Sequence, residues 1–177
     1  MKEKFNKQEK ENSEKILTVL SQNARASSEE IAKKVRLTRQ TVNRILKKLQ
    51  KEKILWGYAP IFDREEFGKK IFILLVKLKI SEDPKKFLEL VKDDQQTQFN
   101  QDSNFILTAY THGNYDFIIM LPADNTIEVK KITNILMSRY RKYFDDVKTL
   151  EIITLFREAS IVNPNFKQKW DELFSTD

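Results

Sequence analysis

The stretch VRLTRQTVNRILKKL, residues 35–49, decides the fold of the N-terminal part of the chain. Its apolar residues recur at the spacing i, i+3, i+4, i+7 and so share one face of an α-helix: Val42, Ile45, Leu46 and Leu49. Thr38 is a favourable N-cap residue, so the helix is expected to begin after Thr38 and to run to about Lys51.

Two shorter helices are predicted before this one, the first over residues 13–20. Ser27 and Glu30 match the capping-box pattern, which predicts the second helix over residues 29–35. The segment ILWGYAPIFD, residues 54–63, mixes β-branched and aromatic residues and is expected to form a short strand or wing. This order is that of a winged helix-turn-helix, which occurs in DNA-binding domains and also as a plain structural corner.

The second half of the chain is predicted to be a ferredoxin-like β-α-β-β-α-β domain, so the fold class is α+β. The predicted strands are 70–80, 105–111, 115–121 and 147–156, and the predicted helices are 84–91 and 126–144. Two helices on one sheet face leave the other apolar face open, so we expect a homodimer formed through the sheet. A polar loop is predicted at 93–104. The tail, 163–174, is predicted to be a helix that docks on its own or a neighbouring subunit.

The charge of the chain is concentrated at its N-terminal end. Residues 1–70 hold 18 Lys and Arg against 10 Asp and Glu, a net charge of +8, whereas residues 71–177 hold 14 against 16, a net charge of −2. A basic N-terminal third indicates a module for nucleic acid or another anionic surface. No apolar run reaches the ~18 residues of a membrane span, the N-terminus is unlike a secretory signal, and the absence of cysteine fits the cytoplasm.

The polar face of the third predicted helix differs from an ordinary solvated face. No acidic residue lies between Glu30 and Glu52, and seven basic side chains lie from Arg36 to Lys53. Arg, Gln and Asn, which pair with base edges, come first, and lysines, which suit phosphates, come last. A solvated basic face remains the alternative. The candidate DNA-binding residues are Ser27, Ser28, Arg36, Thr38, Arg39, Gln40, Thr41, Asn43, Arg44, Lys47, Lys48 and Lys51.

The chain resembles the Lrp/AsnC family, the leucine-responsive or feast/famine transcription regulators of bacteria and archaea, over about residues 12–160. The resemblance rests on EKILTVLSQNARASSEEIAKKV, LTRQTVNRILKKLQKEKILWGY and THGNYDFIIMLPAD, and on Gly57, Gly68 and Gly113, the only three glycines. It implies a winged helix-turn-helix at 12–56, a linker strand at 57–69 and a ferredoxin-like effector and assembly domain at 70–160. The extension 1–11 and the tail 161–177 lie outside the family pattern. We expect an archaeal source.

The resemblance also implies a function. Family members regulate transcription, commonly in response to an amino acid, and assemble as dimers that often build tetramers or octamers. The effector typically sits near a Gly-x-Tyr-Asp turn, where Asp116 is a candidate for an ammonium group and the backbone around Gly113 for a carboxylate. Asp116 satisfying only turn N–H groups is the alternative. The candidate effector residues are Thr111, His112, Gly113, Asn114, Tyr115 and Asp116.

Two other functions remain open on the same architecture. One is an enzyme similar to sirohaem decarboxylases, which use histidines, whereas His112 is the only histidine of this chain. The other is an effector-sensing assembly protein that does not bind DNA, against which the basic N-terminal third argues. We find no nucleophile elbow, P-loop or zinc motif, so we expect neither an enzyme nor a cofactor or metal.

Overall fold

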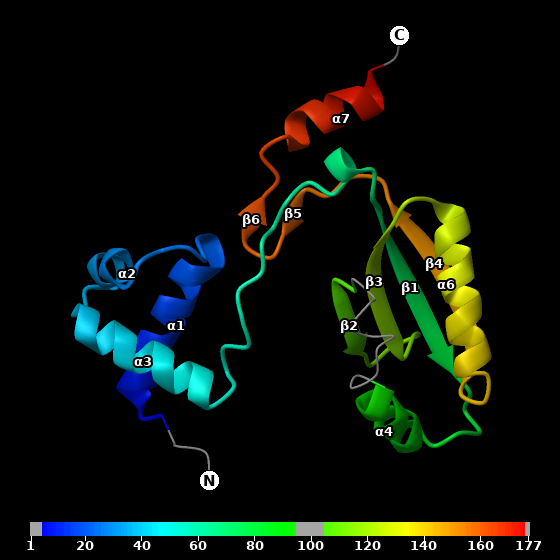
Figure 1. Ribbon diagram of the computed structural model, residues 1–177, viewed down its shortest axis with the longest axis horizontal. Coiled ribbons are helices and arrows are strands. Elements are labelled where there is room, and N and C mark those ends of the chain that lie inside the picture. Colours follow the sequence, from blue (N-terminus) through cyan, green and yellow to red (C-terminus); the bar gives the residue numbers. More distant parts are fainter. Residues whose placement is uncertain (1–4, 95–104, 176–177) are drawn as a thin grey trace. The chain divides into compact units, whose positions relative to one another are not determined.

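The computed structural model describes residues 5–94 and 105–175, and the chain divides into two compact units (Figure 1). The first unit is Met1–Ile61 together with Thr154–Asp177, and the second is Phe62–Ile153. The predicted loop 93–104 falls largely outside the described residues.

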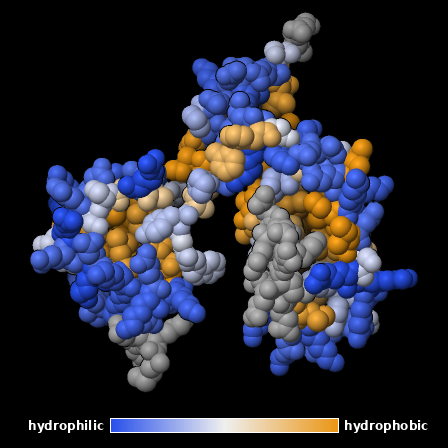
Figure 2. All heavy atoms as spheres, in the orientation of Figure 1, coloured by the Kyte–Doolittle hydropathy of each residue, from blue (hydrophilic) through white to orange (hydrophobic). Residues whose placement is uncertain are grey.

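Three helices form the N-terminal part of the first unit: α1 (Lys7–Gln22), α2 (Ser28–Val35) and α3 (Arg39–Lys51). Their shared core is apolar throughout, and it consists of Ile16, Val19, Leu20, Ile31, Ala32, Val42, Ile45 and Leu49. Leu46 packs against this core and stays partly exposed. The predicted apolar face of α3 is therefore confirmed, and on the face drawn in Figure 2 hydrophilic side chains surround the apolar ones between these helices.

The caps predicted for α2 and α3 are confirmed. The Ser27 hydroxyl accepts from the backbone N–H of Glu30 (3.2 Å), and the Glu30 carboxylate accepts from that of Ser27 (2.7 Å). The Thr38 hydroxyl accepts from the backbone N–H of Thr41 (3.1 Å). Arg36 ends α2 in the left-handed region, at φ 57° and ψ 47°. These local contacts hold α2 and α3 in a tight helix-turn-helix.

The first helix is longer than predicted. It begins at Lys7, inside the predicted extension 1–11, because Asn6 and Glu9 form a further capping box. The Asn6 side chain accepts from the backbone N–H of Glu9 (2.8 Å), and the Glu9 carboxylate accepts from that of Asn6 (3.3 Å). The helix therefore starts inside the segment that the sequence assigns to the extension, since its cap lies at Asn6.

The strand predicted at 54–63 is wrong as well. Among the described residues this segment pairs with no strand, and a short 3-10 helix, η1 (Glu65–Phe67), follows it. Lys53 adopts φ 55°, and the N–H groups of Ile54 and Leu55 turn back to donate to the carbonyl of Leu49 (2.9 and 3.2 Å). The start of the segment therefore extends the C-terminal cap of α3, and the segment joins no sheet within the described part of the chain.

The second unit has the predicted ferredoxin-like topology. Strands β1 (Lys70–Leu78), β2 (Leu107–Tyr110), β3 (Phe117–Ala123) and β4 (Phe144–Ile152) form an antiparallel sheet in the order β2-β3-β1-β4. Helices α4 (Pro84–Asp94) and α6 (Thr126–Arg139) complete the unit (Figure 1). The long helix ends five residues earlier than predicted, because Tyr140 caps it and Phe144 begins β4.

The two faces of the sheet differ in burial. One face carries Phe72, Leu74 and Val76 of β1 and is fully buried in the core of the unit. On the other face Ile73 lies between Met120 of β3 and Leu150 of β4. Ile73 and Met120 are half-buried and Leu150 is exposed, so this face is apolar and incompletely covered.

The chain continues after β4 with a hairpin of β5 (Arg157–Glu158) and β6 (Ile161–Val162), followed by α7 (Phe166–Phe174). Thr154 begins the segment that groups with the first unit, whereas the sequence predicts that the ferredoxin-like domain ends at residue 160. The tail is helical, as predicted. The ring of Phe156 packs against Phe166 (5.7 Å between centroids) and Trp170 (5.9 Å).

Candidate nucleic-acid interface

The outer surface of α3 carries the most accessible of the predicted DNA-binding residues. Arg39 and Gln40 are exposed in its first turn, and Lys47 and Lys51 are exposed in its second half. Arg36, in the turn before the helix, is exposed too. This surface, defined by Arg36, Arg39, Gln40, Arg44, Lys47 and Lys51, is called the α3 outer face below. α3 itself contributes no acidic residue to it.

Several other predicted residues hold the motif together through hydrogen bonds. Ser27 and Thr38 cap their helices, and the Thr38 and Thr41 hydroxyls lie 2.9 Å apart. The Ser28 hydroxyl donates to Oδ1 of Asn43 (2.6 Å), which links α2 to α3. Because Oδ1 of Asn43 accepts from Ser28, the amide NH2 group is the part of Asn43 left to donate outward.

Glu9 of α1 contacts α3, which the sequence did not predict. Its carboxylate accepts from Nη1 of Arg44 (2.9 Å) through Oε1 and from Nζ of Lys48 (3.1 Å) through Oε2. The spacing of Asn6 and Glu9 is that of a capping box, which could have predicted the early start of α1. No sequence pattern predicts that Glu9 contacts α3. Arg44 and Lys48 are therefore not alike: Arg44 is exposed, whereas Lys48 is partly buried beside Glu9.

The two cations also determine how Glu9 titrates. Hydrogen bonds from Arg44 and Lys48 are the largest influences that lower the pKa of Glu9, from 4.5 to about 2. Since the folded-state pKa lies below its unfolded value, ionised Glu9 stabilises the fold above pH 4.5 and loses that contribution as the pH falls toward 2. Glu9 is therefore an anion at any pH at which the protein would bind DNA.

The predicted effector loop lies in the other unit, between β2 and β3. A cavity of about 340 Å³ is lined by Tyr110, Thr111, His112, Gly113 and Asp116. Four of the six predicted effector residues therefore line this cavity. Tyr110, the fifth lining residue, was not predicted because it ends a strand. Asn114 and Tyr115 do not line it. Gly113 adopts φ 153°, a conformation that favours glycine.

Asp116 is tied into the sheet. Its Oδ2 accepts from the backbone N–H of Leu78 (2.8 Å), at the irregularity in the β1–β4 register, and its own N–H donates to Val76 (2.9 Å). The Thr111 N–H donates to the Asp116 carbonyl (2.8 Å). This is the arrangement expected if Asp116 satisfies backbone groups, so a structural role accounts for at least one of its carboxylate oxygens.

Removal of the Asp116 carboxylate should therefore destabilise the second unit. Asp116→Ala leaves the partly buried N–H of Leu78 without its acceptor, which costs about 1–3 kcal/mol. Asp116→Asn, which keeps an acceptor oxygen, should cost less. Urea unfolding followed by circular dichroism measures both, with the exposed Asp145→Ala as control. An Asp116→Ala variant as stable as the control would show that this hydrogen bond is unimportant.

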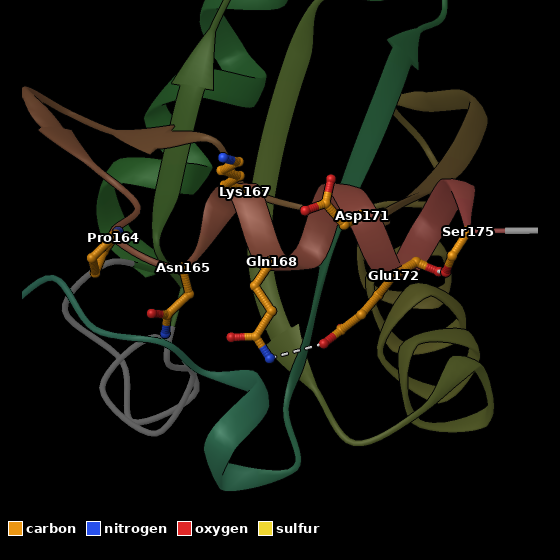
Figure 3. A pocket seen from close by; sticks show the side chains of 7 residues that line it. All are labelled: Pro164, Asn165, Lys167, Gln168, Asp171, Glu172 and Ser175. Carbon is orange, nitrogen blue, oxygen red and sulfur yellow. Dashed lines mark hydrogen bonds between the residues drawn. The ribbon is translucent and has the colours of Figure 1, made fainter.

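A second hollow, of about 560 Å³, runs along α7 (Figure 3). Its lining comes from one helix and the residues beside it, and Gln168 donates to Glu172 (2.9 Å) on the helix surface. None of the residues predicted to bind DNA or an effector lines this hollow. Within residues 5–94 and 105–175, no three His, Cys, Asp or Glu side chains are placed to hold a metal ion, and no helix is long and apolar enough to cross a membrane.

Comparison with known proteins identifies the N-terminal domain. Residues 10–55 match the family model HTH_24, described as winged helix-turn-helix DNA-binding. The chain is 25% identical over 139 residues to PF2053 of Pyrococcus furiosus, named an uncharacterised HTH-type transcriptional regulator. That match covers 77% of this chain and 85% of the relative. The model's limits, 10–55, contain α2, α3 and most of α1.

Solved structures share the fold over nearly the whole chain. LrpC of Bacillus subtilis superposes with a TM-score of 0.59 at 15% identity, covering 88% of this chain and 99% of LrpC. An AsnC family regulator of Agrobacterium tumefaciens gives 0.63 at 14%, covering 88% and 97%. Regulator NMB0573 of Neisseria meningitidis, in complex with L-Met, gives 0.63 at 15%, covering 93% and 99%. The chain therefore joins a winged helix-turn-helix DNA-binding domain to a ferredoxin-like domain in the fold of the Lrp/AsnC transcriptional regulators.

Proposed function

We propose that the protein is a sequence-specific DNA-binding transcriptional regulator of the Lrp/AsnC type. The observation that carries the proposal is the α3 outer face, an exposed basic surface on a capped helix-turn-helix to which α3 contributes no acidic residue. A recognition helix of such a motif lies in the major groove and presents its N-terminal residues to the base edges.

The order of residues along α3 assigns them different roles. Arg39 and Gln40, exposed in the first turn, are placed to form hydrogen bonds with base edges, where Arg pairs with guanine and Gln with adenine. Lys47 and Lys51 farther along, together with Arg36, suit phosphate contacts that fix the register. Ser27, Ser28, Thr38, Thr41 and Asn43 support this surface through the caps and the α2–α3 hydrogen bond.

A homodimer would present two such helices. The open sheet face offers the apolar residues Ile73, Met120 and Leu150 in one row across three strands, with Leu107 of β2 next to Met120. Leu107 and Leu150 are about half exposed in the single chain. A second copy covering this face would remove them from water, and a two-fold dimer reads inverted half-sites about one helical turn, ~10 bp, or a multiple of it apart.

A small molecule, with an amino acid as the first candidate, is proposed to bind at the loop between β2 and β3. The support is the cavity lined by Thr111, His112, Gly113 and Asp116, and the complex of NMB0573 with L-Met. Backbone N–H groups around Gly113 are suited to a carboxylate. An ammonium group would depend on Oδ1 of Asp116, because Oδ2 accepts from Leu78. The proposed regulator acts in the cytoplasm, without a catalytic step or a cofactor.

In-vitro selection from a random duplex pool tests the proposal, with and without a mixture of the common amino acids. We expect enrichment of one motif, arranged as an inverted repeat, and a change in its recovery when the effector is present. A pool that stays random in both arms would overturn the regulator proposal. Enrichment that is identical in both arms would overturn the effector part alone.

A further inference from the structure

The first turn of α1 and Phe5, which precedes its N-cap, pack on the recognition helix. Phe5 lies against the helix-turn-helix core, and Nζ of Lys48 lies 4.4 Å from the centroid of its ring. Glu9, one turn later, binds both Arg44 and Lys48. One apolar contact and two ion pairs therefore hold residues 5–9 against α3. From the sequence, these residues were expected to lie in an extension outside the domain.

The three charged side chains differ in exposure. The Lys48 side chain is 14% exposed and that of Glu9 16%, whereas that of Arg44 is 60% exposed. Lys48 is therefore enclosed between an anion and an aromatic ring, the arrangement of a satisfied charge. Arg44 is bonded to Glu9 through one nitrogen, and most of its guanidinium group still faces solvent.

We propose that Glu9 is a specificity-determining residue of the DNA interface, which positions the Arg44 guanidinium on the α3 outer face and withdraws Lys48 from the DNA phosphates. The inference rests on the proposed DNA-binding function. A fixed guanidinium loses less conformational freedom when it pairs with a base or phosphate, which favours one geometry over others. A cation that is paired internally releases no counterions on binding, so Lys48 adds nothing to sequence-independent affinity.

Two comparisons test the proposal through the salt dependence of binding. Glu9→Gln keeps an acceptor for the N-terminal cap but removes the ion pairs, which frees Lys48. It should bind scrambled DNA more tightly, with a log–log salt slope steeper by about 0.9. Its preference for the selected site should fall by about fivefold or more, the effect of losing one positioned hydrogen-bonding side chain. Glu11→Gln is the matched control, since Glu11 is exposed on the same helix and makes no ion pair among the described residues.

The second comparison is between variants of two neighbouring lysines. It does not require that a Glu9 variant folds. Lys48→Gln should leave the salt slope of the wild type unchanged, whereas Lys47→Gln, one residue away and exposed, should reduce it by about 0.9. Fluorescence anisotropy on selected and scrambled duplexes at several salt concentrations gives slope and preference together, after thermal unfolding has shown that the variants are folded.

The outcomes separate this inference from the function on which it rests. A wild-type protein that binds no DNA in a salt-dependent manner contradicts the proposed function. If the wild type binds but Glu9→Gln keeps its slope and preference, or Lys48→Gln lowers the slope as much as Lys47→Gln does, Glu9 has no such role.

Discussion

Replacement of Arg39 by alanine should weaken binding to the selected DNA site by about 5- to 150-fold, the equivalent of about 1–3 kcal/mol for one bidentate base contact. Arg39 is exposed in the first turn of α3 and makes no ion pair within the described residues, so its guanidinium group is available to DNA. The loss should be much smaller on scrambled DNA, because base contacts contribute to discrimination and phosphate contacts to overall affinity.

Lys47→Ala is the matched comparison for Arg39→Ala. It removes one exposed cation from the same helix and should weaken binding to selected and scrambled duplexes alike, with the salt slope reduced by about 0.9. Anisotropy titrations of both variants on both duplexes distinguish the two patterns. Equal losses on both duplexes for Arg39→Ala would remove Arg39 from the reading residues and leave it among the phosphate contacts.

Replacement of Phe87 by alanine should lower the stability of the second unit by about 3–5 kcal/mol. Phe87, in α4, is 1% exposed, and its ring lies 5.5 Å from those of Phe117, Tyr140 and Phe144 and 5.6 Å from that of Tyr143. Truncation removes the central ring of this aromatic cluster and leaves a cavity that four neighbouring rings cannot fill without moving from their own packing.

Differential scanning calorimetry measures this loss, because a two-unit chain need not unfold in one step. The transition of the second unit should move to lower temperature, while that of the helix-turn-helix stays in place. Leu90→Ala, on the same helix but 42% exposed, should have a much smaller effect. A Phe87→Ala variant within about 1 kcal/mol of the wild type would contradict the packing described for this core.

Local signals predicted most of the fold correctly. The apolar spacing of Val42, Ile45 and Leu49 and the caps at Ser27 and Thr38 act within one or two helical turns, so sequence proximity is sufficient to recognise them. The residues expected to read DNA were predicted from the composition of one helix face; Arg39, Gln40 and Arg44 are exposed there, whereas Asn43 is partly buried.

Contacts between distant parts of the chain could not be predicted. Glu9 meets Lys48 across 39 residues, and Ser28 meets Asn43 across 15, and neither pair has a periodic signature. Both contacts alter the candidate DNA-binding surface, because they give Lys48 and Asn43 partners within the protein. A helical-wheel projection of α3 alone does not show these partners. Residues 54–63 were misjudged for a related reason: strand-forming residues need a neighbouring strand, and the segment has none among the described residues.

The effector loop shows the same limit. Asp116 was identified in its turn, but its hydrogen bond to Leu78 crosses 38 residues and depends on the strand register. The register also brings Tyr110 to the cavity beside His112, although Tyr110 reads in the sequence only as part of a strand. The side chains that line a cavity depend on how the strands pair. That pairing is determined by contacts across the whole sheet and not by any short stretch of sequence.

The ratio of affinities for the selected duplex and a scrambled duplex, measured for the wild-type protein at physiological salt, tests the central claim most directly. Because the α3 outer face is proposed to read base sequence, the ratio should reach about 10³ or more, as for specific DNA-binding regulators. A ratio near one, with strong salt dependence on both duplexes, would show that α3 is a basic helix that binds DNA without reading it.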